Sequence, residues 1–146
     1  MKIRNAARDD FSALVPLFKR FATTQEDGLE LRFQQLLEHP DHLILVAEIE
    51  AKVVGYATVQ GYGARLRSGD ESTRLNDLLV VAEHRSKGIG SALLEQVKLW
   101  CKSRGARYLE WQSSSQGAMF YQKLGLKPEV PNLEYPFFEI DFKAES

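Results

Sequence analysis

The sequence predicts an α/β or α+β sandwich with a mixed β-sheet, formed by a single domain over residues 1–146. The first reason is the order of the expected elements: strand, two helices, three strands, helix, strand, helix and a final strand. The second is that no repeat, low-complexity tract or linker-like segment interrupts this order. A chain of 146 residues is also long enough to bury one hydrophobic core.

The N-terminal part is expected to hold a strand and two helices. Residues 3–6 favour a short strand, after which Asp9 or Asp10 can cap a helix. Pro16 is expected to kink or divide that helix, because proline lacks the amide that the helix interior needs. A second helix is predicted over residues 29–38. The apolar residues of the first helix follow a helical period: Phe11, Leu14, Val15, Phe18 and Phe21.

The rest of the chain alternates between strand and helix patterns. Residues 43–50 and 53–61 predict a β-hairpin, and residues 75–81 predict a strongly apolar strand. An amphipathic helix is expected over residues 88–104, with its apolar residues in one stripe. The remaining predictions are a strand over 108–112, a helix over 117–124, and a last strand in which Phe137, Phe138, Ile140 and Phe142 form the apolar positions.

Composition and charge limit the classes of function. The chain carries 19 Lys and Arg against 20 Asp and Glu, a net charge of −1, which argues against binding to nucleic acid or to an anionic membrane. Its single cysteine, Cys101, cannot form an internal disulfide, and no apolar run has the length of a signal peptide or a membrane span. We therefore expect a cytoplasmic protein.

A loop with two spaced glycines joins the apolar strand to the long helix. Gly88 and Gly90 open the helix, and glycine lets the backbone approach a ligand closely because it has no Cβ. The first amides of a helix point outward at the positive end of its dipole, and Arg85 and Lys87 add positive charge here. These features predict a pyrophosphate site, and the competing interpretation is a solvated helix start.

The same glycines could belong to a dinucleotide-binding fold, because Glu110 has the spacing expected of a ribose-binding acid. Two mismatches weigh against this alternative. Leu93 stands where a third Gly or Ala is needed. Residues 82–87 also separate the strand from Gly88, where a tight turn is expected.

Two segments resemble the GNAT superfamily of N-acetyltransferases. Residues 80–90, Val-Val-Ala-Glu-His-Arg-Ser-Lys-Gly-Ile-Gly, are followed by Ala-Leu-Leu at 92–94 and are similar to its cofactor-binding motif. Residues 118–126, Ala-Met-Phe-Tyr-Gln-Lys-Leu-Gly-Leu, resemble its later motif. The resemblance implies a mixed, mostly antiparallel central sheet that is flanked by helices and splayed at the strand that binds the cofactor.

The resemblance also implies acetyl-CoA as the acyl donor. The backbone of residues 78–80 would pair with the pantetheine like an added strand, and the loop 85–91 would hold the pyrophosphate. A backbone amide of the splayed strand would polarise the thioester carbonyl. The implied cofactor-binding residues are Leu78, Leu79, Val80, Arg85, Ser86, Lys87, Gly88, Ile89, Gly90, Ser91 and Ser115.

The resemblance assigns the catalytic role to Tyr121, which matches the position that protonates the departing CoA thiolate. The competing interpretation is a packed interfacial aromatic. Ser115 stands where many members carry Asn, and Asn76 and Asp77 stand where relatives often place a glutamate base. Asn cannot act as a base, and strand alternation predicts that Asp77 projects to the opposite face from Asn76. The amine is then expected to lose its proton to water or to an unassigned group.

The expected function is N-acetyl transfer to the primary amine of a small molecule by direct attack, with Tyr121 as general acid. A protein or peptide N-acetyltransferase and a non-catalytic acyl-CoA-binding sensor are the alternatives. The first two helices and residues 61–74 are the segments that would distinguish a closed pocket from an open groove.

Two expectations concern metals and assembly. No metal is expected, because His39 and His42 share a turn with only one carboxylate. A homodimer is expected from the aromatic tail, residues 135–142, which offers apolar surface.

Overall fold

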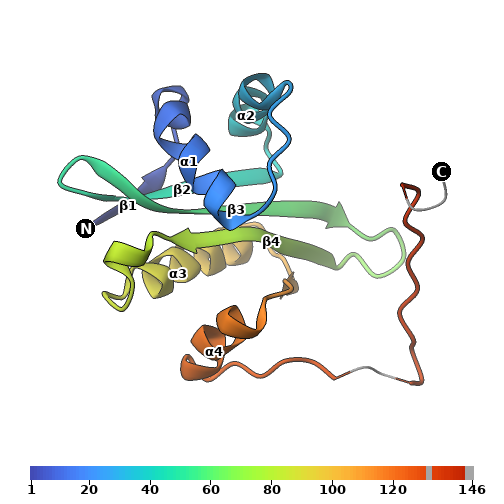
Figure 1. Ribbon diagram of the computed structural model, residues 1–146. Helices are drawn as coiled ribbons and strands as arrows, with labels where there is room; N and C mark the ends of the chain where they lie inside the picture. The colour runs from blue at the N-terminus through green and yellow to red at the C-terminus, as the bar shows by residue number, and fades with distance from the viewer. Residues whose placement is uncertain (131–132, 144–146) are drawn as a thin grey trace. The chain divides into compact units, whose positions relative to one another are not determined.

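The computed structural model describes residues 1–130 and 133–143. The chain falls into two compact units, residues 1–112 and the segment from Ser113 onward. The elements of the first unit are β1 (Lys2–Asn5), η1 (Arg8–Asp10), α1 (Phe11–Phe21), α2 (Leu29–Glu38), β2 (His42–Ile49), β3 (Lys52–Ala64), β4 (Glu71–Val80), η2 (Ala82–His84), α3 (Ile89–Ser103) and β5 (Tyr108–Glu110). The second unit contains α4 (Ser115–Lys123) (Figure 1).

The five strands form one mixed sheet in the order β1-β2-β3-β4-β5. The pairs β1–β2, β2–β3 and β3–β4 are antiparallel, and the pair β4–β5 is parallel. This confirms the predicted mixed, mostly antiparallel sheet flanked by helices. β5 pairs only with residues 72–74 of β4. Among the residues that the structure describes, no strand therefore pairs with that edge of β4 over residues 75–80.

Helices cover both faces of this sheet. In Figure 1, α1 and α2 lie on one face and α3 lies on the other. On the first face, the ring of Tyr56 packs edge-on against Phe18 of α1, with 5.0 Å between the ring centroids. On the second face, the hydroxyl of Thr73 lies 3.2 Å from the thiol of Cys101 in α3. Both Tyr56 and Thr73 are fully buried, so the sheet contributes to a core on each side.

Two expectations about individual elements differ from the structure. Pro16 was expected to kink or divide the first helix, and the division is absent, because α1 continues through Pro16. Pro16 is exposed while Leu14 and Leu17 are buried, and burial of these leucines outweighs the loss of one helix hydrogen bond. The predicted last strand is also absent from residues 133–143. A strand needs a neighbour to accept and donate its backbone hydrogen bonds, and no strand of the described chain pairs with this segment.

One arginine, Arg104, connects the end of α3 to the start of β4 and to the turn before β2. Arg104 donates to both carboxylate oxygens of Glu71, at 2.6 and 3.0 Å, and to the carboxylate of Asp41 at 2.5 Å. Its guanidinium also stacks on Trp100, 4.5 Å from the ring centroid. Gly61 lies against this guanidinium, and a Cβ at Gly61 would come within 2.7 Å of it. Arg104 therefore holds the helix, the start of β4 and the turn before β2 together.

The described part of the chain offers no helix that combines the length and the apolar character needed to cross a lipid bilayer.

Candidate active site

The loop between β4 and α3 has the backbone of an anion site. Ser86 and Gly88 both adopt positive φ angles, +65° and +81°, and Gly88 directly precedes α3. A Cβ at Gly88 would meet nothing within 4 Å, so the left-handed backbone, and not lack of space, favours glycine there. Gly88, the N-cap residue of α3, has no side chain that could cap the first amides of this helix. Such a turn directs several backbone N–H groups at one point, where an anion can accept hydrogen bonds from them.

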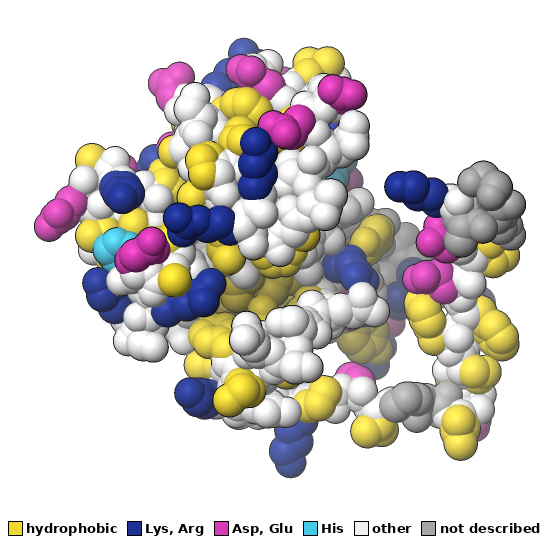
Figure 2. Space-filling model, in the orientation of Figure 1, with side chains coloured by type: hydrophobic (Ala, Val, Ile, Leu, Met, Phe, Trp, Pro, Cys, Tyr) yellow, Lys and Arg dark blue, Asp and Glu magenta, His cyan; other side chains and the backbone are white. Residues whose placement is uncertain are grey.

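Positive charge surrounds this loop. Arg85 donates through Nε to the carbonyl of Val80 at 3.0 Å, which ties the loop to the end of β4. The ammonium of Lys87 lies 3.3 Å from Nδ1 of His84. Figure 2 shows Lys and Arg side chains gathered over η2 and the start of α3. The structure thus brings together the predicted cofactor-binding residues of β4 and of the loop: Leu78, Leu79, Val80, Arg85, Ser86, Lys87, Gly88, Ile89, Gly90 and Ser91.

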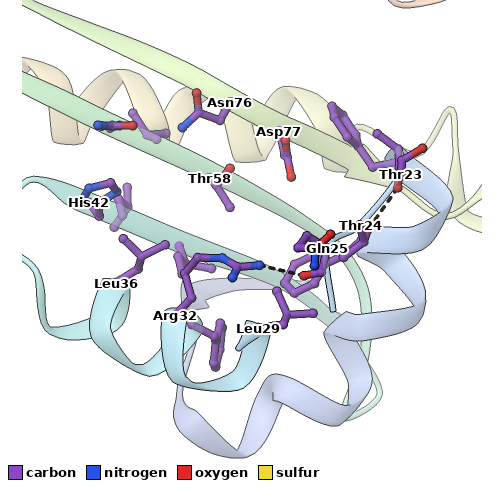
Figure 3. Close-up of a pocket in the computed structure, with 18 residues that line it drawn as sticks. Thr23, Thr24, Gln25, Leu29, Arg32, Leu36, His42, Thr58, Asn76 and Asp77 are labelled. Atoms are coloured by element: carbon purple, nitrogen blue, oxygen red, sulfur yellow. Dashed lines mark hydrogen bonds between the residues drawn. The ribbon is translucent and has the colours of Figure 1, made fainter. Parts of the chain in front are cut away.

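A β-bulge changes which way the following part of β4 faces. Thr58 of β3 is opposite Asp77, but Val59 is opposite Leu75, so Asn76 is an extra residue in β4. An extra residue reverses the alternation of side chains beyond it. Asn76 and Asp77 consequently line the same cavity (Figure 3). The expectation that Asp77 projects to the opposite face is therefore wrong.

This cavity has a volume of about 390 Å³ and lies on the face of the sheet that α1 and α2 cover. It falls within the size range of small-molecule sites. One wall comes from β2, β3 and β4, and the other comes from α1, α2 and the segment between them (Figure 3). Its residues are Phe18, Phe21, Ala22, Thr23, Thr24, Gln25, Leu29, Arg32, Phe33, Leu36, His42, Leu43, Ile44, Thr58, Val59, Gln60, Asn76 and Asp77.

Asp77 carries the charge on the strand wall of the cavity. Tyr56, whose side chain is fully buried, donates a hydrogen bond of 2.7 Å to Oδ2 of Asp77. Burial raises the pKa of Asp77 above its usual range, and the bond from Tyr56 offsets part of that rise. Burial, with the nearby charge of Asp77, also raises the pKa of Tyr56, so the phenol stays protonated. Among the described residues no cation forms an ion pair with Asp77.

Two further ionisable residues line the helix side and the far end of the cavity. Arg32 of α2 donates to the carbonyls of Gln25, at 2.8 Å, and Asp27, at 3.3 Å, and so holds the segment between α1 and α2 (Figure 3). Burial, with a smaller contribution from His39, lowers the pKa of His42. His42 is therefore neutral at neutral pH.

The remaining predicted site residues, Ser115 and Tyr121, lie on α4 in the second unit. Ser114 caps this helix by accepting a hydrogen bond of 3.1 Å from the amide of Gly117. The ring of Tyr121 packs against Phe120, with 5.0 Å between centroids. Burial raises the pKa of Tyr121, which keeps its hydroxyl protonated at neutral pH.

Comparison with known proteins decides the family. A family model described as an acetyltransferase (GNAT) domain matches residues 40–128, more than half of the chain. The chain belongs to the GNAT acetyltransferase family. The matched range contains the bulged strand, the glycine loop and α4, so the resemblance inferred from the two motifs is confirmed.

Relatives of this GNAT protein carry the same general description. YhfO of Bacillus subtilis, an uncharacterized N-acetyltransferase, is 27% identical over 143 residues, which cover 92% of this chain and 95% of YhfO. Glucosamine 6-phosphate N-acetyltransferase of Arabidopsis thaliana is 25% identical over 122 residues, 82% of each chain. The crystal structure of an Arabidopsis thaliana glucosamine-6-phosphate N-acetyltransferase superposes with a TM-score of 0.78 at 23% identity, over 94% of this chain and 98% of that one. These matches support an acyltransferase with the GNAT fold.

Sequence reasoning singled out the glycine loop of this GNAT protein as a cofactor site, which stays a prediction, but missed most of the cavity beside β4. Arg32 and Phe18 were assigned only to helices, and Asp77 was assigned to the wrong face. The polar pair Asn76-Asp77 inside an apolar strand was the available signal, because a bulge is one way to place two successive residues on the same side of a sheet.

Proposed function

We propose that this protein is an N-acetyltransferase that transfers the acetyl group of acetyl-CoA to the primary amine of a small molecule. The observation that carries the proposal is the placement of Asp77. This carboxylate lines a small-molecule cavity and directly precedes residues 78–80 of β4, which pair with β3 on one edge and with no described strand on the other. Acceptor and donor sites would then meet at one point of β4. The proposed domain spans residues 1–146, and the family match supports this because it extends across both units.

The residues at the end of β4 fit a CoA thioester. The free edge of β4 leaves backbone groups available to an extended pantetheine, in the manner of an added strand. The left-handed turn at Ser86 and Gly88, with Arg85 and Lys87 nearby, fits a pyrophosphate. Bound acetyl-CoA would supply an activated acetyl group. The proposed ligands are the ten residues of β4 and the loop named above, together with Ser115.

We propose that Asp77 is the general base that removes a proton from the ammonium form of the acceptor. An amine reaches the site mostly as an ammonium ion, which a carboxylate attracts and can deprotonate. The raised pKa of Asp77 makes it a stronger base than an exposed aspartate. The neutral nitrogen then attacks the thioester carbon, the C–N bond forms and the C–S bond breaks. The nitrogen is cationic after the attack and releases its second proton to solvent, which gives the neutral amide. The sulfur leaves with the electron pair of that bond.

Tyr121 is the proposed donor of a proton to the leaving sulfur. Its support is the match of residues 118–126 to the later GNAT motif, together with the raised pKa that keeps the phenol protonated. A phenol held near the sulfur would neutralise the thiolate as it forms.

The cavity favours this proposal over the two alternatives. The absence of the glutamate that relatives often place on this strand would favour a non-catalytic sensor, but Asp77 supplies a carboxylate that lines the proposed acceptor cavity. A volume of about 390 Å³ suits a small molecule better than a polypeptide segment. The Arabidopsis relative named for glucosamine 6-phosphate also takes a small-molecule amine. The cytoplasmic location and the homodimer stay predictions. For the dimer, Figure 2 shows apolar side chains along the C-terminal segment, and Phe137 and Phe138 are each 85% exposed.

The test is release of free CoA from acetyl-CoA in the presence of a panel of small primary amines, with peptides that have free N-termini as a parallel panel. We expect turnover with at least one small amine and an acetylated product by mass spectrometry. If only the peptides are turned over, the acceptor is a peptide N-terminus and not a small-molecule amine. Tight acetyl-CoA binding without turnover of any amine would instead support the sensor.

A further inference from the structure

The acceptor cavity carries two opposite charges on different walls. Asp77 lies on β4 and Arg32 lies on α2, across the cavity from the sheet (Figure 3). Among the described residues that line the cavity, these two are the only ones of the Asp, Glu, Lys and Arg types, and the neutral His42 adds no charge. The space between the two walls is lined in part by apolar side chains such as Phe18 and Leu36.

The charge of Arg32 is not neutralised by a carboxylate of the described chain. Its two hydrogen bonds go to backbone carbonyls, those of Gln25 and Asp27. Arg4 and Arg104 differ, because each forms an ion pair with at least one carboxylate. A guanidinium has five N–H donors, so Arg32 can still donate to a ligand while it holds the segment between α1 and α2.

Within residues 1–130 and 133–143, the hydrogen-bond partner of Asp77 is also uncharged: it is the phenol of Tyr56. A ligand with a cation at one end and an anion at the other would therefore neutralise the charges of both Asp77 and Arg32. Complementary charges of this kind select between ligands more than they add raw affinity.

We propose that the acceptor is a compact zwitterion, with its primary amine at Asp77 and an anionic oxygen group at Arg32. The proposal rests on the proposed function and specifies its substrate class. A short carbon skeleton between the two groups fits the apolar lining and the volume of about 390 Å³. Carboxylate and phosphate share the chemistry that a guanidinium recognises.

The test compares acceptors that differ only in the anion. ω-Amino acids and aminoalkyl phosphates of short chain length are each paired with the amino alcohol of the same length. The measurement is kcat/KM from CoA release. Loss of a hydrogen bond to a charged group costs about 10- to 100-fold in binding, and we expect the parent protein to prefer one of the anionic series by that factor. The two anionic series distinguish carboxylate from phosphate.

Two variants of Arg32 and one control locate the effect. Arg32→Gln should lower kcat/KM for the anionic acceptor by a larger factor than for the amino alcohol, and so remove the preference between the two. Arg32→Lys should keep part of the preference for the anionic acceptor, because lysine keeps the positive charge but lacks the planar, two-pronged donor geometry of a guanidinium. Arg8→Gln removes an exposed arginine that does not line the cavity and should match the parent. The proposal is overturned if the parent uses the amino alcohols equally well, or if Arg32→Gln lowers both activities alike.

A failure of the proposed function gives a different result. If the parent acetylates none of these amines, the assignment as a small-amine acetyltransferase fails. Calorimetric titration with the same charged and neutral pairs then decides the inference. Tighter binding of the zwitterion that is lost in Arg32→Gln supports the charge-selective cavity, and equal binding of both ligands refutes it.

Discussion

The hydroxyl of Tyr56 donates a hydrogen bond of 2.7 Å to Oδ2 of Asp77 across the β3–β4 pair. Tyr56 is held in place by burial and by the ring of Phe18, so it fixes the direction in which the carboxylate faces. The bulge at Asn76 is what turns Asp77 toward Tyr56 and the cavity. In this arrangement the pKa of Asp77, the proposed base, is set by two opposing effects, burial and one hydrogen bond.

Asp77→Asn should lower kcat/KM for the amine by about 10²- to 10⁴-fold, the usual contribution of a positioned base. The side chain keeps its size but loses its basicity, so acetyl-CoA affinity should not change. In the parent, activity should fall as pH falls through the raised pKa of Asp77, because only the carboxylate accepts a proton. The variant should lack that acidic limb. Asp9→Asn, an exposed aspartate in η1, is the matched control. A variant with the parent's pH profile would exclude Asp77 as the base.

Tyr56→Phe should move the acidic limb of the pH profile to higher pH. The hydrogen bond from Tyr56 lowers the pKa of Asp77, so its removal lets that pKa rise further. The base is then protonated over a wider range, and kcat at neutral pH decreases. The phenyl ring preserves the contact with Phe18. Tyr62→Phe, on an exposed part of β3, controls for loss of a hydroxyl. An unmoved limb would mean that Tyr56 has a packing role alone.

Tyr121→Phe should reduce the single-turnover rate by about 10²- to 10⁴-fold while acetyl-CoA binding stays constant. The change removes the proton donor and keeps the ring that packs on Phe120. Single turnover is the appropriate measurement, because slow product release would hide a chemical effect in kcat. Equal single-turnover rates for variant and parent would remove Tyr121 from the mechanism and leave it as a packed aromatic.

Gly90→Asp should weaken acetyl-CoA binding at least about 10-fold, because it places bulk and negative charge in the first turn of α3, at the proposed pyrophosphate site. Isothermal titration calorimetry measures the affinity, and circular dichroism checks the fold. Gly69→Asp makes the same chemical change at the tip of the β3–β4 hairpin, where the φ of +76° favours glycine. If circular dichroism shows that its fold is intact, this variant should bind acetyl-CoA as the parent does. Unchanged affinity in Gly90→Asp would place the cofactor elsewhere.

Arg104→Ala should lower the free energy of unfolding by about 2–3 kcal/mol, because it leaves the buried Glu71 without its main partner. The hydrogen bond from Arg104 lowers the pKa of Glu71. The stabilisation is therefore present above the usual glutamate pKa and is lost as pH falls through the lowered one. Urea unfolding at neutral and acidic pH should show the difference between parent and variant shrinking with acidification.

The control for that prediction is Arg107→Ala, which breaks an exposed ion pair with Asp70. Exposed pairs contribute little to stability, so this variant should unfold close to the parent. If both variants unfold alike at every pH, Arg104 does not fasten α3 to the sheet in the way its contacts indicate.

Local patterns in the sequence determined much of this protein. The helix over Leu29–Glu38 and the stripe of α3 follow from the spacing of apolar residues, which acts within a few turns. The proposed donor loop is local in the same sense, since Gly88 and its neighbours form one continuous segment. Two motifs in order were enough to indicate the GNAT family, which the family match confirms.

Tertiary structure alone decided the proposed acceptor cavity and the direction of Asp77. The bulge at Asn76 is a property of the register between β3 and β4, and period-two alternation cannot show it from one strand. Arg32 meets the same cavity because α2 packs over the sheet, far along the chain from β4. The tail has the alternating residues of a strand yet forms none in residues 133–143. A strand forms only when its backbone groups make hydrogen bonds to a neighbouring strand, and the sequence of one segment does not indicate whether such a neighbour is present.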